Sequence, residues 1–262
     1  MTGPRTDALA REEPLEIRVQ GRSVAVTMRT PGYDPELAAG FLLTEGLIGR
    51  RSDIVEVAHC QRGVARHNTL NVFVAGSVKV DFERLTRHVF ATSSCGLCGA
   101  ASIDAVHRHF PPLETQITVS ADKLLKLPGR LRARQWMFEQ TGGLHAAAVF
   151  DEQGRLVVSH EDVGRHNAVD KVIGHGLLRD ELPYDRHILM VSGRASFEIL
   201  QKALAARIPI VCAVSAPSSL AADFAKESGQ TLVGFLRAES MNVYSHPERI
   251  LFPQRRRTPR RS

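Results

Sequence analysis

The chain has 262 residues, 43% of them hydrophobic, so it can bury the core of one large domain or two modest ones. No run of about 20 apolar residues could cross a bilayer, and the opening residues contain no signal-peptide-like stretch, so we expect a cytoplasmic protein without membrane insertion. The formal net charge is +6, but residues 253–262 hold five arginines, which is typical of a disordered basic tail. With 6% aromatic residues, the chain lacks the pattern of a nucleic-acid binder.

The N-terminal part predicts a small α+β unit. Two alternating runs, 15–18 and 23–28, flank Gln20-Gly21 and indicate a hairpin. Asp34-Pro35-Glu36 is a helix start, and the apolar run that follows predicts a helix through Ile48 with a stop at Gly49. Three further strands are expected, at 54–58, 71–75 and 78–82, with Gly76-Ser77 as a tight turn between the last two.

A pair of cysteines, Cys95 and Cys98, precedes a helix-compatible stretch over 100–106. After Pro112 the composition changes towards a polar linker and short helices. We therefore place a domain boundary near residue 115, with an N-terminal domain at 14–115 and a second domain at 116–252.

The C-terminal part predicts an α/β sheet. A hairpin is expected from strands 144–150 and 155–159, followed by a short helix over 167–173 that ends at Gly174. The remaining elements alternate: strand 187–191, helix 196–206, strand 208–214, helix 218–228 and strand 231–235. This βαβαβ order implies parallel strands covered by helices.

Three kinds of chemistry compete for the CxxC pair. A thiolate at a helix start is stabilised by the helix dipole, and Cys95, the first of the pair, is the better nucleophile. A structural zinc site lacks a second ligand pair, because Cys60 and Cys212 are isolated, so we expect no metal. A thioredoxin-like dithiol stays open, although no sheet pattern of that fold follows. Two inert buried cysteines are disfavoured by the serines and glycines around them.

The ends of the three C-terminal strands carry residues suited to a ligand. Strand 187–191 runs into Ser192-Gly193-Arg194, the next runs into Ser215, and the third into Arg237. In open α/β sheets, ligands bind beyond the carboxyl ends of the strands, where arginines can clamp phosphates. The alternative is that these are ordinary helix caps and surface arginines.

The polar segment 161–171 has two interpretations. His166 and Asp170 share a helical face, as do Asn167 and Lys171, so the segment is either a solvated helix or part of a pocket in which Asp170 orients His166 and Lys171 contacts an anion. Nearby, 141–147 resembles part of the zinc-deaminase signature, but Ala147 stands where the catalytic glutamate would be, so deamination is excluded.

Six segments together resemble the formate dehydrogenase accessory sulfurtransferase family (FdhD), in consistent order over about residues 30–252. They are SSCGLCG, TGGLHAA, EDVGRHNAVDK, SGRASFEILQKA, SAPSSLA, and GFLR with NVYSHPERI. The resemblance implies a deaminase-like α/β fold for the C-terminal domain. It also implies that Cys95 accepts sulfur from a cysteine desulfurase and passes it to the bis(molybdopterin guanine dinucleotide) form of the molybdenum cofactor for formate dehydrogenase.

The resemblance extends the binding site to the segment 235–240. The residues then expected to contact the cofactor are Ser192, Gly193, Arg194, Ser215, Ala216, Pro217, Phe235, Leu236, Arg237, Ala238, Glu239 and Ser240. Two other functions stay open: a thiol–disulfide oxidoreductase, which explains the CxxC but not the pocket, and a non-catalytic cofactor chaperone, which explains the pocket but not the thiolate. A homodimer is expected from the general frequency of dimers.

Overall fold

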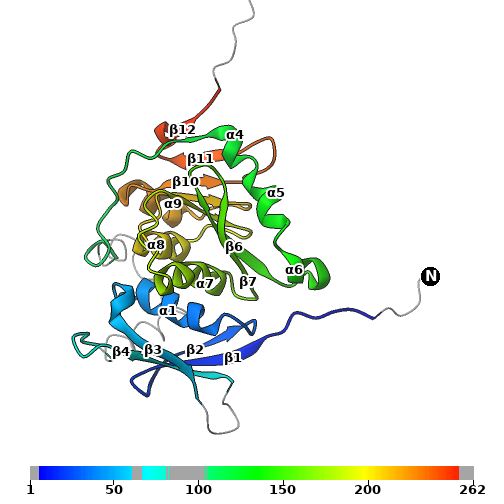
Figure 1. The fold of residues 1–262 in the computed structure, drawn as a ribbon. Helices are drawn as coiled ribbons and strands as arrows, with labels where there is room; N and C mark the ends of the chain where they lie inside the picture. Colours follow the sequence, from blue (N-terminus) through cyan, green and yellow to red (C-terminus); the bar gives the residue numbers. More distant parts are fainter. Residues whose placement is uncertain (1–5, 61–66, 81, 83–103, 105, 254–262) are drawn as a thin grey trace, which may run out of the picture.

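The computed structural model describes residues 6–60, 67–80, 82, 104 and 106–253 (Figure 1). Cys95 and Cys98, and with them the helix expected over 100–106, therefore fall outside the described residues apart from Asp104 and Val106. No helix in the described part of the chain is long and apolar enough to span a membrane.

Among the described residues, a four-stranded sheet and the helix α1 form most of the N-terminal part. They are β1 (Glu13–Val19), β2 (Arg22–Arg29), α1 (Asp34–Thr44), the 3-10 turn η1 (Arg51–Asp53), β3 (Ile54–His59) and β4 (Thr69–Val74). The sheet order is β2-β1-β4-β3, with β1 and β4 parallel. The expected hairpin is confirmed, and its two turn residues, Gln20 and Gly21, have φ of 52° and 79°, as a twist-matched two-residue turn requires.

Two N-terminal predictions are wrong in detail. The helix ends at Thr44 rather than Ile48, because Gly46 adopts a left-handed conformation and Leu47 donates its amide to the carbonyl of Leu42, which is a Schellman cap. The strand expected at 78–82 is absent from the described residues: 78–80 is irregular and Phe82 is helical. The reason is that β4 already has β1 and β3 on its two sides, so no free edge is left for a returning strand.

A six-stranded sheet of order β11-β10-β9-β8-β6-β7 forms the C-terminal part. Its strands are β6 (His145–Asp151), β7 (Leu156–Asp162), β8 (His187–Val191), β9 (Ile210–Ala213), β10 (Thr231–Gly234) and β11 (Asn242–Ser245). The hairpin β6–β7 and the parallel strands β8, β9 and β10 are confirmed. The α/β class is therefore as predicted, with β11 as an additional antiparallel edge strand.

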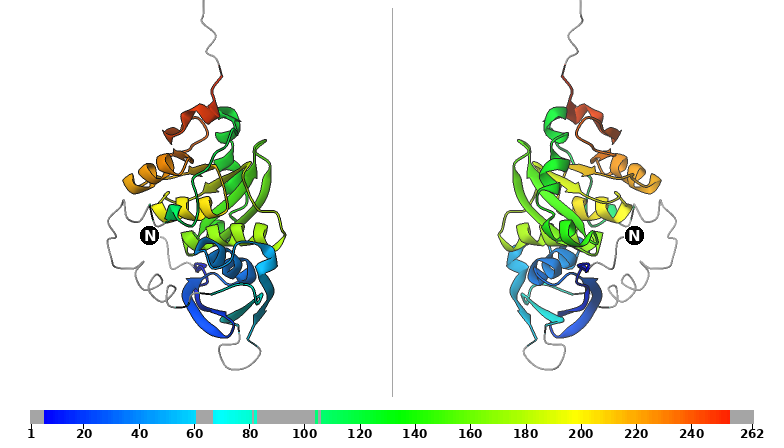
Figure 2. Two further views of the ribbon diagram at one scale, coloured as in Figure 1. Left: turned by 90° about the vertical axis from the view of Figure 1, so that its left-hand side faces the viewer. Right: turned by 90° about the vertical axis from the view of Figure 1, so that its right-hand side faces the viewer.

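Helices cover both faces of this sheet. On one face lie α7 (Arg165–Leu178), α8 (Phe197–Ala205) and α9 (Ser219–Glu227). The other face is covered by β5 (Val119–Ser120), α4 (Ala121–Leu124), α5 (Leu127–Arg132) and β12 (Ile250–Leu251), with α6 (Trp136–Thr141) and the 3-10 turn η2 (Pro247–Arg249) nearby. The side views in Figure 2 show the small N-terminal sheet at one end of the molecule and η2 with β12 at the other.

The contact between α1 and α7 joins the two parts, and α1 lies between the small sheet and α7 (Figure 1). It is a glycine contact: a Cβ on Gly40 would lie 1.9 Å from the carbonyl oxygen of Asp170, and one on Gly174 would lie 1.8 Å from that of Glu36. Gly174 therefore serves close packing rather than helix termination, which is why α7 runs on to Leu178 instead of ending at 173 as predicted.

One hydrophobic core runs through this contact. It includes Ile17 of β1 and Leu37 of α1 together with Val172 of α7 and Leu189 of β8. A buried ion pair reinforces it, because Lys202 of α8 lies 2.9 Å from the carboxylate of Asp170. The boundary proposed near residue 115 stays a prediction.

We expect Gly174→Ala to lower the free energy of unfolding by about 1–3 kcal/mol, because the added methyl group would force the α1 and α7 backbones apart. The matched control is Gly129→Ala in α5, where an added Cβ meets nothing within 4 Å, so stability should be unchanged or slightly raised. Urea denaturation of both variants measures the difference. Equal stability of the two variants would contradict the close-packed contact.

Candidate functional site

The expected ligand-binding segments meet at one edge of the large sheet. The parallel strands β8, β9 and β10 end at this edge, and the antiparallel pairing places the start of β6 and the end of β7 there too. The structure thus brings together 192–194, 215–217 and 235–240. The strand alternation predicted the first two segments and Arg237, and the family resemblance added the rest of 235–240. Their contact with a cofactor stays a prediction.

The first of these segments is built partly into the sheet. Ser192 donates its amide to the carbonyl of Ala146 at 2.9 Å, and its hydroxyl accepts the amide of Ala146 at 2.8 Å. A Cβ on Gly193 would lie 3.3 Å from Nδ1 of His145, so the absence of a side chain lets that ring approach. Arg194 is exposed and free of any ion pair with the residues that the structure describes. Of the three, it offers a side chain to a ligand.

The second segment is hydrogen-bonded through its backbone to both the first and the third. The amide of Ser215 bonds to the carbonyl of Gly193 at 3.3 Å, and its carbonyl accepts the amide of Phe235 at 3.2 Å. Ala216 is half-buried, and Pro217 forms a parallel bridge with Ala195. This loop therefore offers backbone and one hydroxyl rather than charge.

Phe235 is the most unusual residue of the third segment, with φ of 49° and 42% of its surface exposed. Leu236 is fully buried in the core, and Ala238, Glu239 and Ser240 are exposed. Arg237 donates its guanidinium to the carbonyl oxygens of Val214 and Leu236. That side chain is therefore partly committed to the protein's own backbone.

Asp170 and Lys171 do not line the site. Lys171 is buried, with its Nζ 2.7 Å from the carboxylate of Asp162 and 2.9 Å from the carbonyl of Thr30. Asp170 is equally buried and pairs with Lys202. The interpretation in which Asp170 orients His166 and Lys171 contacts an anion is therefore wrong: both residues hold the N-terminal part against α7 and α8.

Asp162 fixes the turn that leads into α7. Its carboxylate accepts the amides of Gly164 at 2.8 Å and Thr30 at 3.2 Å, as well as the side-chain amide of Asn167 at 3.0 Å. Asn167 in turn donates to the carbonyl of Met28 at 2.8 Å. This network places the first residues of α7, Arg165 and His166, at the strand-end edge.

His166 is oriented by Glu198 at the start of α8. Its Nε2 lies 2.9 Å from the Glu198 carboxylate and 3.4 Å from the hydroxyl of Ser196, the residue that precedes α8. The hydrogen bond from His166 is the main cause that lowers the pKa of Glu198 to about 2. The two helix starts, α7 and α8, are thus linked side by side at the site.

His145 is a site residue that sequence reasoning did not select. It begins β6, and its pKa is lowered, first by burial and then by the positive charges of Arg165, His166 and Arg194. Nε of Arg165 is buried and has no hydrogen-bond partner among the described residues. The available signal was the TGGLH segment, which the sequence analysis compared with deaminases and used for the family resemblance without giving His145 a role.

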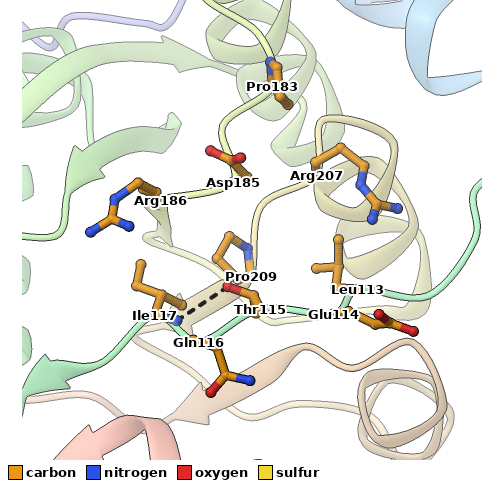
Figure 3. Close-up of a pocket in the computed structure, with 10 residues that line it drawn as sticks. All are labelled: Leu113, Glu114, Thr115, Gln116, Ile117, Pro183, Asp185, Arg186, Arg207 and Pro209. Atoms are coloured by element: carbon orange, nitrogen blue, oxygen red, sulfur yellow. Dashed lines mark hydrogen bonds between the residues drawn. The ribbon is translucent and has the colours of Figure 1, made fainter.

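A cavity of about 360 Å³ lies at the opposite edge of the sheet, where β8 and β9 begin (Figure 3). It is lined by the connecting segment 113–117 and by loop residues that include Arg186 and Arg207. Arg186 pairs with Glu152 at 2.6 Å, and Arg207 donates to the carbonyl of Pro111 at 2.5 Å. None of the described residues that line it is a histidine or a cysteine, so they offer no group for sulfur chemistry.

Two of the four cysteines are described. Cys212 lies fully buried in β9, where burial raises the pKa of its thiol, so it is a poor nucleophile. Cys60 is half-buried just after β3. Within the described ranges, no group of three or more His, Cys, Asp or Glu residues is arranged to hold a metal ion, and the expectation for Cys95 and Cys98 stays a prediction.

The fold and the site define a layered α/β protein with a basic strand-end edge. Its sequence matches the FdhD/NarQ family over residues 10–251. It is 52% identical to proteins named sulfur carrier protein FdhD from Streptomyces coelicolor and Mycobacterium tuberculosis, over 94% of this chain and 90% and 92% of theirs. A crystal structure of a formate dehydrogenase accessory protein from Desulfotalea psychrophila matches with a TM-score of 0.73 and 29% identity, over 94% of this chain and 91% of that one. The chain therefore belongs to the FdhD/NarQ family.

We expect the stabilising effect of the His166–Glu198 pair to fade in acid. The folded-state pKa of Glu198, about 2, lies below its ordinary value of 4.5, so its contribution is present above pH 4.5 and is lost as the pH falls towards 2. The difference in unfolding free energy between the wild type and Glu198→Gln should therefore shrink from pH 5.5 to pH 3. Glu139→Gln, at an exposed position of α6, is the control, and a constant difference for Glu198→Gln would count against the ion pair.

Proposed function

We propose that this protein is a sulfurtransferase that carries sulfur as a persulfide on Cys95. It receives the sulfur from a cysteine desulfurase and passes it to the bis(molybdopterin guanine dinucleotide) cofactor, the substrate, which then serves formate dehydrogenase. The main support is family membership over residues 10–251, a range that contains the CxxC pair, together with relatives named sulfur carriers. The likeness to a formate dehydrogenase accessory protein supports the client enzyme.

The thiol chemistry favours Cys95 as the sulfur carrier. A persulfide carrier needs an accessible thiolate, which excludes the buried Cys212. Cys60 stands alone, whereas Cys95 has Cys98 three residues on, so a second thiol is available to tune or resolve a persulfide.

The substrate also suits the strand-end edge. A cofactor with two guanine nucleotides carries several negative charges, and the edge offers the guanidinium of Arg194 beside backbone loops that begin α8 and α9. A thiol–disulfide oxidoreductase would have no use for this basic edge. Action in the cytoplasm and assembly as a homodimer remain predictions.

We expect incubation with a cysteine desulfurase and cysteine to add one sulfur atom to Cys95. The acceptor thiolate attacks the desulfurase persulfide, so the sulfane sulfur moves to Cys95 and the desulfurase cysteine leaves as a thiolate. Mass spectrometry of the intact protein and of its peptides measures the gain, with Cys95→Ala as the control. A Cys95–Cys98 disulfide without added sulfur would instead support the oxidoreductase.

We expect Cys95→Ala to abolish sulfur transfer and Cys98→Ala to reduce it less, because transfer through one sulfur does not require a second thiol. The measurement is formate dehydrogenase activity in cells that lack the native accessory protein and are supplied with each variant at matched expression. Full activity with Cys95→Ala would remove Cys95 as the carrier. Equal loss from both variants would favour the dithiol mechanism, in which both cysteines are needed for turnover.

A further inference from the structure

We propose that Arg165, His145 and Arg194 form a binding site for a diphosphate group. The site lies at the edge of the large sheet where β6 begins and β8 ends. Neither Arg165 nor His145 is among the strand-end residues expected from the sequence. The inference rests on the proposed function, because it assigns the place where the diphosphate of that substrate binds.

Three separate elements bring these side chains to one place. His145 is the first residue of β6, Arg165 is the first residue of α7, and Arg194 lies in the loop between β8 and α8. The His145 ring packs over Gly193, next to Arg194. The turn before α7 is fixed by Asp162, so Arg165 is held in position rather than left on a loose surface loop.

Among the described residues, the positive charge at this edge exceeds the negative charge. Two carboxylates act on the site: Asp162, which pairs with Lys171 and whose charge acts to raise the pKa of His145, and Glu198, which pairs with His166 and whose pKa is also lowered by Arg165. Arg165 and Arg194 form no close ion pair with the residues that the structure describes. Basic groups that exceed the nearby carboxylates in this way make a site that favours an anion.

The buried Nε of Arg165 points to what the site accepts. A buried donor on a charged group is costly to leave without a partner, and this one finds none among the described residues. A phosphate oxygen would satisfy it in the planar geometry that guanidinium groups prefer. The pKa of His145 is lowered by burial and then by the neighbouring positive charges. A bound anion would favour its protonated form and so add a further donor.

Arg18 also has a buried Nε without a hydrogen-bond partner among the described residues, but its guanidinium pairs with Glu16, and three further arginines are bonded within the protein. Arg237, the clamp expected from the sequence, donates to the backbone carbonyls of Val214 and Leu236. In the cavity of Figure 3, Arg186 and Arg207 are likewise occupied by Glu152 and by a backbone carbonyl. By comparison, the Nε of Arg165 has no hydrogen-bond partner among the described residues.

The test is calorimetry of the full chain with inorganic diphosphate at low salt. Arg165→Gln should weaken diphosphate binding about tenfold or more, the scale of losing a charged hydrogen bond. The matched control is Arg155→Gln, at the β6–β7 turn on the opposite edge, which should bind like the wild type. Unchanged affinity in Arg165→Gln, or no diphosphate binding by the wild type, would overturn the proposal.

Competition experiments distinguish recognition of the diphosphate group from recognition of the base and sugar. GDP should displace inorganic diphosphate, whereas guanosine should not, and displacement by guanosine would overturn the assignment of this edge to the phosphates.

If Arg165→Gln fails to fold, NMR titration of His145 in the wild type replaces it: diphosphate should raise the pKa of His145, and an unchanged pKa refutes the site. Loading of sulfur on Cys95 uses no nucleotide, so failure of that experiment alone would refute the sulfur carrier and leave the anion site standing.

Discussion

The close contact of α1 with α7 is the constraint on which the rest of the structure depends. Two helices that meet at Gly40 and Gly174 approach until backbone touches backbone, and any side chain at either position would separate them. The approach lets Thr44 of α1 share Asp170 with Lys202, at 3.0 Å and 2.9 Å, so a buried polar network crosses from the N-terminal part to α8. Because these groups are sealed from water, each needs the others as partners, and the relative position of the two parts is fixed.

The segment 161–171 shows how one motif serves two purposes. Asp162, Asn167, Asp170 and Lys171 are buried and tie α7 to Thr30, Met28 and the neighbouring helices. Arg165 and His166, on the remaining face of the first turn, are the residues left to meet a ligand. The first group sets the position of the second: the buried side chains hold the start of α7 at the strand ends with little freedom to shift, as a preformed binding site requires.

The sequence predicts the large sheet well because its signals there are local. Strand 187–191 has the predicted bounds, and the parallel order follows from the alternation of strands and helices. Prediction from the sequence fails where a residue's role is set by a partner far away in the chain. Gly174 has the appearance of a helix stop but faces the backbone of Glu36, and Lys171 has the appearance of an anion ligand but neutralises Asp162. His145 and Arg165 are twenty residues apart, and only the antiparallel pairing of His145 with Asp162, at the end of β7, brings them together.

The described residues on both sides of the cysteine segment are tied to different parts of the molecule. Before it, Phe82 lies under the guanidinium of Arg22 in the β1–β2 hairpin, at 4.3 Å. After it, His107 stacks on Phe224 of α9, with ring centroids 5.4 Å apart. One attachment belongs to the N-terminal sheet and the other to a helix of the large sheet, so the α1–α7 contact fixes the span between them. A change that loosened this contact would therefore alter the distance between these two attachments, even though neither glycine takes part in either of them.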